Sequence, residues 1–125
     1  MHKLIIAGGR FFSDYELLKH EVKKFIVEEI KTKKNLEIVS GKAKGADRLG
    51  EQFAAEFGIQ VKQFPANWNE HGKKAGPMRN EKMAQYATGE YCICFWDGSS
   101  RGTENMIENA KKYGLSLRVV RYDQT

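Results

Sequence analysis

A glycine-containing loop between an apolar segment and an amphipathic one is the first place where the residue types suggest chemistry. Residues 40–47 read Ser-Gly-Lys-Ala-Lys-Gly-Ala-Asp, and residues 46–57 continue with helical periodicity. Gly41 and Gly45 allow a tight turn and a close approach by a ligand. The first N–H groups of a helix lack intrahelical acceptors and carry partial positive charge. Such a junction is typical of a site for phosphate or another anion.

The same arrangement occurs twice more. The apolar run 4–7 leads into Gly8-Gly9-Arg10, and the run 91–96 leads into the loop 97–103. In a parallel sheet the carboxyl ends of the strands meet at one edge, where ligands bind. Three small-residue loops at that edge predict a nucleotide-like ligand; the alternative is that all three are ordinary strand-to-helix connections.

Four polar residues beside these loops are candidates for ligand contact. Arg10 could reach an anion. Asp47, in the first turn of a helix, could compensate the helix dipole, orient a neighbouring loop or bind a ribose hydroxyl. Arg79 offers a planar donor fork suited to phosphate, and with Asn80 it is expected in the first turn of a helix. A cation there opposes the helix dipole, so we expect Arg79 to serve a ligand rather than local stability, and Gly45 to matter more for binding than for folding.

The third loop and one aromatic residue complete the predicted site. The loop offers hydroxyl groups and the Glu104 carboxylate, but it is short and lacks the lysine of a Walker A motif, which excludes a P-loop ATPase. Trp68 could stack on a base or seal its own loop onto the protein. The predicted ligand-binding residues are Gly8, Gly9, Arg10, Gly41, Lys44, Gly45, Ala46, Asp47, Trp68, Arg79, Asn80, Gly98, Ser99, Ser100, Gly102, Thr103 and Glu104. No metal site and no cofactor is predicted.

Composition limits the classes of protein to which this chain can belong. It has 125 residues and a net charge of +5, which fits one domain over residues 1–125 and permits an anionic ligand or nucleic acid as partner. No apolar run approaches the length of a membrane span, and the N-terminus lacks a signal-peptide layout, so we expect a cytoplasmic protein with no membrane partner. Cys92 and Cys94 lie two apart in an apolar run and are expected to be buried thiols rather than a disulfide or a metal site.

Strand and helix patterns alternate along the chain. Strands are expected at 3–8, 36–40, 59–64, 90–96 and 116–121, and helices at about 13–32, 46–57 and 77–87. A last helix is expected to follow the loop of Gly98 and Gly102 and to run to residue 113. Ser13 and Glu16 have the spacing of a capping box, Pro77 suits the first position of a helix, and 66–76 is expected to be irregular. This alternation predicts an α/β fold: a Rossmann-like three-layer sandwich with a mainly parallel sheet of about five strands.

Several of these segments together resemble a known family. They are Gly8-Gly9-Arg10, residues 40–47, 64–68 and 75–83, and Gly102-Thr103. In order and spacing they resemble the YspA-like proteins of the SLOG superfamily, which includes DNA-processing proteins, Lonely-guy phosphoribohydrolases and nucleotide-sensing domains. The resemblance implies a Rossmann-like sheet with a nucleotide-type ligand at these loops.

The resemblance is weaker for catalysis. Lonely-guy enzymes carry a Pro-Gly-Gly-x-Gly-Thr-x-x-Glu loop with a catalytic arginine and glutamate. Arg79 matches the arginine, but Met106 stands where the glutamate would be, and Glu104 is the nearest carboxylate. We therefore expect a nucleotide-binding sensor or sequestering module with little or no phosphoribohydrolase activity. A nucleotide N-glycosidase using Arg79 and Glu104, and a single-stranded nucleic-acid binder, stay open as alternatives, as do the identity of the ligand and assembly into a homo-oligomer.

Overall fold

Five parallel strands form one sheet in the computed structural model, which describes residues 1–122. The strands are β1 (His2–Gly8), β2 (Leu36–Ser40), β3 (Gln60–Gln63), β4 (Tyr91–Trp96) and β5 (Ser116–Arg121), in the spatial order β3-β2-β1-β4-β5. The helices are α1 (Tyr15–Phe25), η1 (Ile26–Ile30), α2 (Ala46–Phe57), α3 (Trp68–His71), η2 (Gly72–Lys74), α4 (Ala75–Tyr86) and α5 (Arg101–Lys112). The predicted α/β sandwich with a five-stranded parallel sheet is confirmed.

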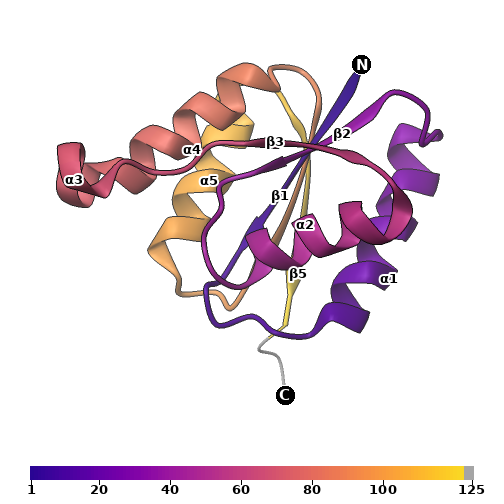
Figure 1. Ribbon diagram of the computed structural model, residues 1–125, viewed down its shortest axis with the longest axis horizontal. Coiled ribbons are helices and arrows are strands. Elements are labelled where there is room, and N and C mark those ends of the chain that lie inside the picture. The colour runs from indigo at the N-terminus through magenta and orange to yellow at the C-terminus, as the bar shows by residue number, and fades with distance from the viewer. Residues whose placement is uncertain (123–125) are drawn as a thin grey trace.

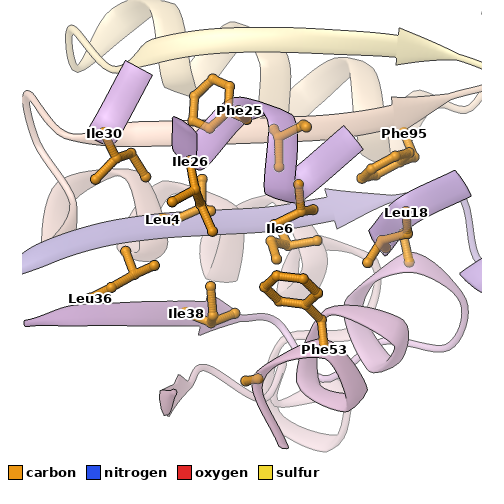
Figure 2. Close-up of a cluster of buried hydrophobic side chains, with 14 of the residues drawn as sticks. Leu4, Ile6, Leu18, Phe25, Ile26, Ile30, Leu36, Ile38, Phe53 and Phe95 are labelled. Atoms are coloured by element: carbon orange, nitrogen blue, oxygen red, sulfur yellow. The ribbon is translucent and has the colours of Figure 1, made fainter. Parts of the chain in front are cut away.

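Helices cover both faces of the sheet, with α1 and α2 on one side and α4 and α5 on the other (Figure 1). Two apolar layers result because side chains alternate along each strand. In β1, Leu4 and Ile6 point into the layer that also holds Phe25 and Phe53, shown in Figure 2. Ile5 and Ala7 point into the opposite layer, beneath α4 and α5. A strand buried on both faces reads as a continuous apolar run, as expected for a central parallel strand.

The two cysteines occupy that second layer. Cys92 and Cys94 are both buried and unlinked, with 3.6 Å between their sulfur atoms. Their contact and their burial raise the pKa of the Cys92 thiol. The prediction of two buried thiols is confirmed.

The first helix differs from the prediction at both ends. Asp14, not Ser13, caps α1, because its carboxylate accepts a hydrogen bond of 3.0 Å from the Leu17 N–H. The helix then widens into the π-turn η1 and ends at Lys31, whose φ is +70°. The apolar residues keep their helical spacing through η1, so the sequence pattern does not mark the change from α-helix to π-helix.

The stretch before the third predicted helix is mostly helical rather than irregular. Asn67 caps the short α3 by accepting from the Glu70 N–H, and η2 connects it to α4. The main helix α4 begins at Ala75, so Pro77 is its third residue instead of its first. Proline is tolerated there because N–H groups of the first turn have no intrahelical acceptor. Within residues 1–122, no helix is long and apolar enough to cross a membrane.

Candidate functional site

A cleft of about 780 Å³ opens at the carboxyl ends of the central strands. The chain runs outward from β1 through β2 to β3, and then crosses to β4 and β5 on the other side of β1. The crevice outside β1 and β4 is therefore the topological switch point, where parallel α/β sheets bind ligands. The end of β1, the loop before α2, the helix α4 and the first turns of α5 all contribute to its walls.

Many of the predicted residues do line this cleft, and others do not. The lining includes Gly8, Arg10, Lys44, Asp47, Trp68, Arg79, Asn80, Ser100, Gly102 and Thr103. The predicted residues outside the lining are Gly9, Gly41, Gly45, Ala46, Gly98, Ser99 and Glu104. Most of the second group hold the loops in place, as described below.

The cleft is strongly cationic. Six basic side chains line it and Asp47 is the single carboxylate among its lining residues. The basic residues are Arg10, Lys42, Lys44, Arg48, Arg79 and Arg101. Lys42 lies 3.9 Å from Glu51, a long and partly exposed pair that weakens its charge only slightly. Positive charge gathered in a concave site raises the local concentration of anions, so the arrangement suits a negatively charged ligand.

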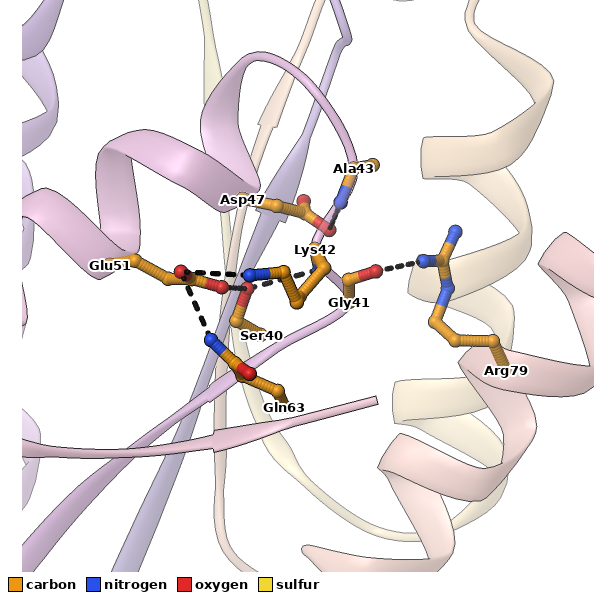
Figure 3. A network of polar contacts seen from close by, with 8 residues as sticks. All are labelled: Ser40, Gly41, Lys42, Ala43, Asp47, Glu51, Gln63 and Arg79. Carbon is orange, nitrogen blue, oxygen red and sulfur yellow. Dashed lines mark hydrogen bonds and ion pairs between the residues drawn. The ribbon is translucent and has the colours of Figure 1, made fainter. Parts of the chain in front are cut away.

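Arg79 lines the cleft and extends from α4 toward Gly41 in the loop before α2 (Figure 3). It is the fifth residue of α4, hence in the second turn and not in the first turn as predicted. Its guanidinium donates a hydrogen bond to the Gly41 carbonyl oxygen, and its Nε donates to Asn80 Oδ1 at 2.9 Å. Burial lowers the pKa of Arg79, whereas the neighbouring Asp47 carboxylate opposes that change. Arg79 thus has a structural role within the protein that the dipole argument did not foresee.

Asp47 is the buried partner of this arginine. It is only 4% exposed, and its carboxylate accepts from the Ala43 N–H at 3.3 Å and from the Gly41 N–H. Burial raises the pKa of Asp47 to about 6, although Arg79 and the two N–H donors act against that rise. Of the roles considered for Asp47, the structure supports orientation of the loop, since both backbone donors belong to the loop before α2.

The loop before α2 is held by protein groups and leaves few free amides. The Lys42 N–H donates to Ser40 Oγ at 3.1 Å, and Ser40 Oγ donates to Glu51 at 2.6 Å (Figure 3). Lys42 has a φ of +58°, an unfavourable conformation for a residue with a side chain. The hydrogen bonds of Ser40 and Asp47 therefore hold a strained loop that displays its lysine toward the cleft.

The loop before α5 is organised in the same way. Asp97 Oδ1 accepts from the N–H groups of Ser99 and Ser100 at 2.8 and 2.7 Å, and these bonds lower the pKa of Asp97. Ser100 caps α5. The amides of Ser99 and Ser100 are consequently occupied, whereas the first-turn N–H groups of Arg101 and Gly102 have no intrahelical acceptor. Two amides of the predicted phosphate-binding loop are thus engaged by the protein itself.

Gly45 packs against another loop instead of opening space for a ligand. It has a φ of +82°, and a Cβ there would lie 2.2 Å from the Gly9 carbonyl oxygen. The Ala46 N–H donates to that same oxygen at 3.2 Å. Gly45 is therefore needed for folding where the first two loops cross, and its role in binding stays a prediction.

Two exposed aromatic side chains lie near the cleft. Trp68 is 59% exposed at the start of α3 and lines the cleft beside Gly76. Phe11 is 89% exposed and lies under the Arg10 guanidinium, with 5.7 Å from the guanidinium carbon to the ring centre. A tryptophan that sealed a loop would be buried, so the exposure of Trp68 leaves its face available to a base.

Comparison with known proteins shows the family to which the chain belongs. Residues 2–71, from β1 through α3, match the YspA, cpYpsA-related SLOG family. The chain belongs to the YspA, cpYpsA-related SLOG family. It is also 31% identical over 123 residues to the Gene 61 protein of Mycobacterium phage D29, with 94% of each chain covered. No solved structure matches it.

The residues considered for catalysis can now be located in the structure. Met106 is 1% exposed and packs with Ile107 and Ala110 beneath α5, as expected, while it also contributes to the floor of the cleft. Glu104 is exposed and outside the cleft lining. The carboxylate considered for glycosidic cleavage is therefore displaced from the site, where Asp47 is already engaged by the loop.

Sequence reasoning missed several lining residues of the SLOG site. These are Ala7, Lys42, Ala43, Arg48, Gly76, Pro77, Arg101, Asn105 and Met106. Lys42 and Arg101 stand inside the glycine loops, and Arg48 lies in the first turn of α2 beside Asp47. No comparable signal marked Asn105, because an asparagine within an amphipathic helix usually faces solvent.

Proposed function

We propose that this SLOG-family protein binds a nucleotide or a nucleotide-derived ligand in the cleft at the switch point and acts as a sensor or sequestering module. The observation that carries the proposal is the concentration of six cationic side chains around one cleft with a single carboxylate. Membership of the family is consistent with such a ligand.

Two further properties of the cleft favour a nucleotide over a simple anion. Its volume of about 780 Å³ is in the range of small-molecule sites and far exceeds what one phosphate needs. Trp68 presents an exposed aromatic face on the same cleft. In this arrangement Arg101 and Arg10 neutralise phosphate, the start of α5 supplies backbone donors, and Trp68 covers the base.

Isothermal titration calorimetry tests the proposal. The purified protein is titrated with nucleoside monophosphates, nucleoside diphosphates, the unphosphorylated nucleosides and inorganic phosphate. We expect nucleotides to bind more tightly than either nucleosides or inorganic phosphate, and their binding to weaken in Arg101→Ala. Lys24→Ala, which removes an equal charge from the exposed side of α1, is the matched control and should bind like the wild type.

The alternative of single-stranded nucleic-acid binding is an outcome of the same experiment. An oligonucleotide contacts many cationic side chains of a protein, so its affinity falls steeply as salt concentration rises. Much tighter binding of a short oligonucleotide than of any mononucleotide, with such a salt dependence, would replace the small-ligand proposal. No binding of any phosphorylated compound would refute both.

A further inference from the structure

Three asparagine side chains form a continuous chain between α4 and α5, at the wall of the cleft. Asn80 Nδ2 donates to Asn105 Oδ1 at 3.0 Å and to the Gly102 carbonyl oxygen at 3.2 Å. Asn109 Nδ2 donates to the same Asn105 Oδ1 at 3.2 Å and to the Asn105 carbonyl oxygen at 3.0 Å. Asn80 and Asn109 are buried, and Asn105 is half-buried.

The direction of this chain is determined at both ends. An asparagine amide can be turned by 180°, so its orientation must be inferred from partners of known character. Asn80 receives a hydrogen bond from Arg79 Nε, which can only donate, and gives one to a backbone carbonyl, which can only accept. Asn109 also gives one to a backbone carbonyl. Both residues must therefore direct Nδ2 toward Asn105.

Asn105 is consequently fixed with its oxygen toward the protein. Turning its amide over would place donor against donor at both Asn80 and Asn109. Within residues 1–122, Asn105 Nδ2 has no protein partner, and no buried side-chain nitrogen or oxygen lacks one. The nitrogen is therefore accessible, and Asn105 is a lining residue of the cleft.

We propose that Asn105 is a ligand-binding, specificity-determining residue that offers two N–H donors to an acceptor oxygen of the ligand. The inference rests on the proposed function of the same cleft. Arg79 and Arg101 beside it are also donors only, so this wall selects acceptors such as phosphate or base carbonyl oxygens. A ligand group that can only donate would leave both partners unpaired and would be rejected.

The orientation of Asn105 can be tested without a ligand. Side-chain amide signals are recorded by nuclear magnetic resonance, assigned with Asn80→Asp, Asn105→Asp and Asn109→Asp, and followed for exchange with solvent. We expect slow exchange at Asn80 and Asn109 and fast exchange at Asn105. Slow exchange at Asn105 in the free protein would overturn the proposal, because its donors would then be occupied.

Binding of AMP and inorganic phosphate tests the contact itself. Saturation with AMP should slow exchange at the Asn105 amide, and Asn105→Ala should weaken binding by about tenfold, as for loss of a hydrogen bond to a charged group. Asn105→Asp should weaken it further, since it replaces the donor with a carboxylate. Asn35→Asp makes the same substitution beside the amino end of β1, where the Asn35 carbonyl oxygen pairs with the His2 N–H, and should leave affinity within about twofold of wild type.

The outcomes separate this inference from the proposed function. A wild-type protein that binds neither phosphate nor any of the nucleotides refutes the proposed function, while the exchange rates still decide the orientation of Asn105. A wild type that binds AMP with Asn105→Ala unchanged and no protection of the amide refutes only the inference. Weakened binding of both probes assigns the contact to phosphate oxygens, and weakened binding of AMP alone assigns it to a base or sugar oxygen.

Discussion

The Arg79 guanidinium donates a hydrogen bond to the carbonyl oxygen of Gly41, and thereby ties α4 to the loop that precedes α2. These residues are 38 positions apart in sequence, and Arg79 lines the cleft whereas Gly41 lies just outside its lining. The Asp47 carboxylate also holds this loop, because it accepts a hydrogen bond from the Ala43 N–H. An arginine that a ligand would need is therefore also one that the unliganded protein needs.

Replacing Arg79 with alanine is expected to lower both stability and affinity. It removes the hydrogen bonds to Gly41 and Asn80 and leaves the Asp47 carboxylate without its cationic neighbour, at a cost of about 1–3 kcal/mol in unfolding free energy. Loss of a contact with a charged ligand costs about 1.5–3 kcal/mol of binding free energy. Chemical denaturation and calorimetry with AMP measure the two effects. Arg79→Lys retains the positive charge but lacks the planar guanidinium, so it should recover only part of the stability and part of the affinity. Unchanged stability of Arg79→Ala would show that the hydrogen bond to Gly41 contributes nothing.

The contribution of Asp47 to the stability of the protein is expected to fall as pH rises from about 4 to about 6. The pKa of this residue is about 6 in the folded protein and 3.8 in the reference state. The folded protein binds the extra proton in this range, so the stabilising contribution is complete below 3.8 and is lost as pH rises through 6. The difference corresponds to about 3 kcal/mol.

Comparison with Asp47→Asn isolates that contribution. The variant cannot titrate at this position, so the difference in unfolding free energy between it and the wild type should change with pH only between about 4 and 6. Urea denaturation at several pH values measures it. A difference that is constant across this range would show that the carboxylate keeps an ordinary pKa.

Gly45→Ala is expected to destabilise the fold. Its Cβ would meet the backbone of Gly9 at 2.2 Å and of Arg10 at 2.6 Å, from a φ of +82°. Strain and overpacking together should cost about 2–4 kcal/mol. Gly102→Ala is the matched control, because a Cβ there has no atom within 4 Å, and alanine in a helix gains about 0.5–1 kcal/mol over glycine. Equal melting temperatures of the two variants would contradict the close packing of the loops.

Trp68→Ala is expected to weaken nucleotide binding with little change in stability. The side chain is 59% exposed, and loss of one stacked base costs about 1–3 kcal/mol. Trp68→Phe, which keeps an aromatic face, should retain most of the affinity. Calorimetry with AMP and with inorganic phosphate separates the effects, since only AMP has a base; an equal loss for both compounds would exclude stacking.

We expect no release of free base from nucleoside monophosphates. Glu104 lies outside the cleft lining, Met106 is part of the core, and Asp47 is bonded to the loop. Chromatography of reactions with purine and pyrimidine monophosphates checks this, with Glu104→Gln and Asp47→Asn as matched variants. Turnover in the wild type that either change abolishes would make the protein an N-glycosidase.

The sequence determined the order of the elements and the edge of the sheet at which the site lies. Apolar runs such as 4–7 and 91–96 specify buried parallel strands by themselves, because burial on both faces requires continuous apolar residues. Glycine loops after these strands are local signals too. Ser13 and Pro77 led to errors only in where two helices begin. A neighbouring residue can provide the cap in place of Ser13, and proline is tolerated at more than one position of the first turn.

Only the tertiary structure decided which of the residues in these loops face the cleft and which hold the loops together. Gly45 meets the Gly9 backbone, Arg79 meets Gly41, and Asn105 is oriented by Asn80 and Asn109. Each of these relationships joins groups on different elements or depends on such a contact. The residue pattern of one segment indicates which secondary structure that segment forms. The partner of a buried hydrogen-bond donor or acceptor depends instead on how separate segments pack.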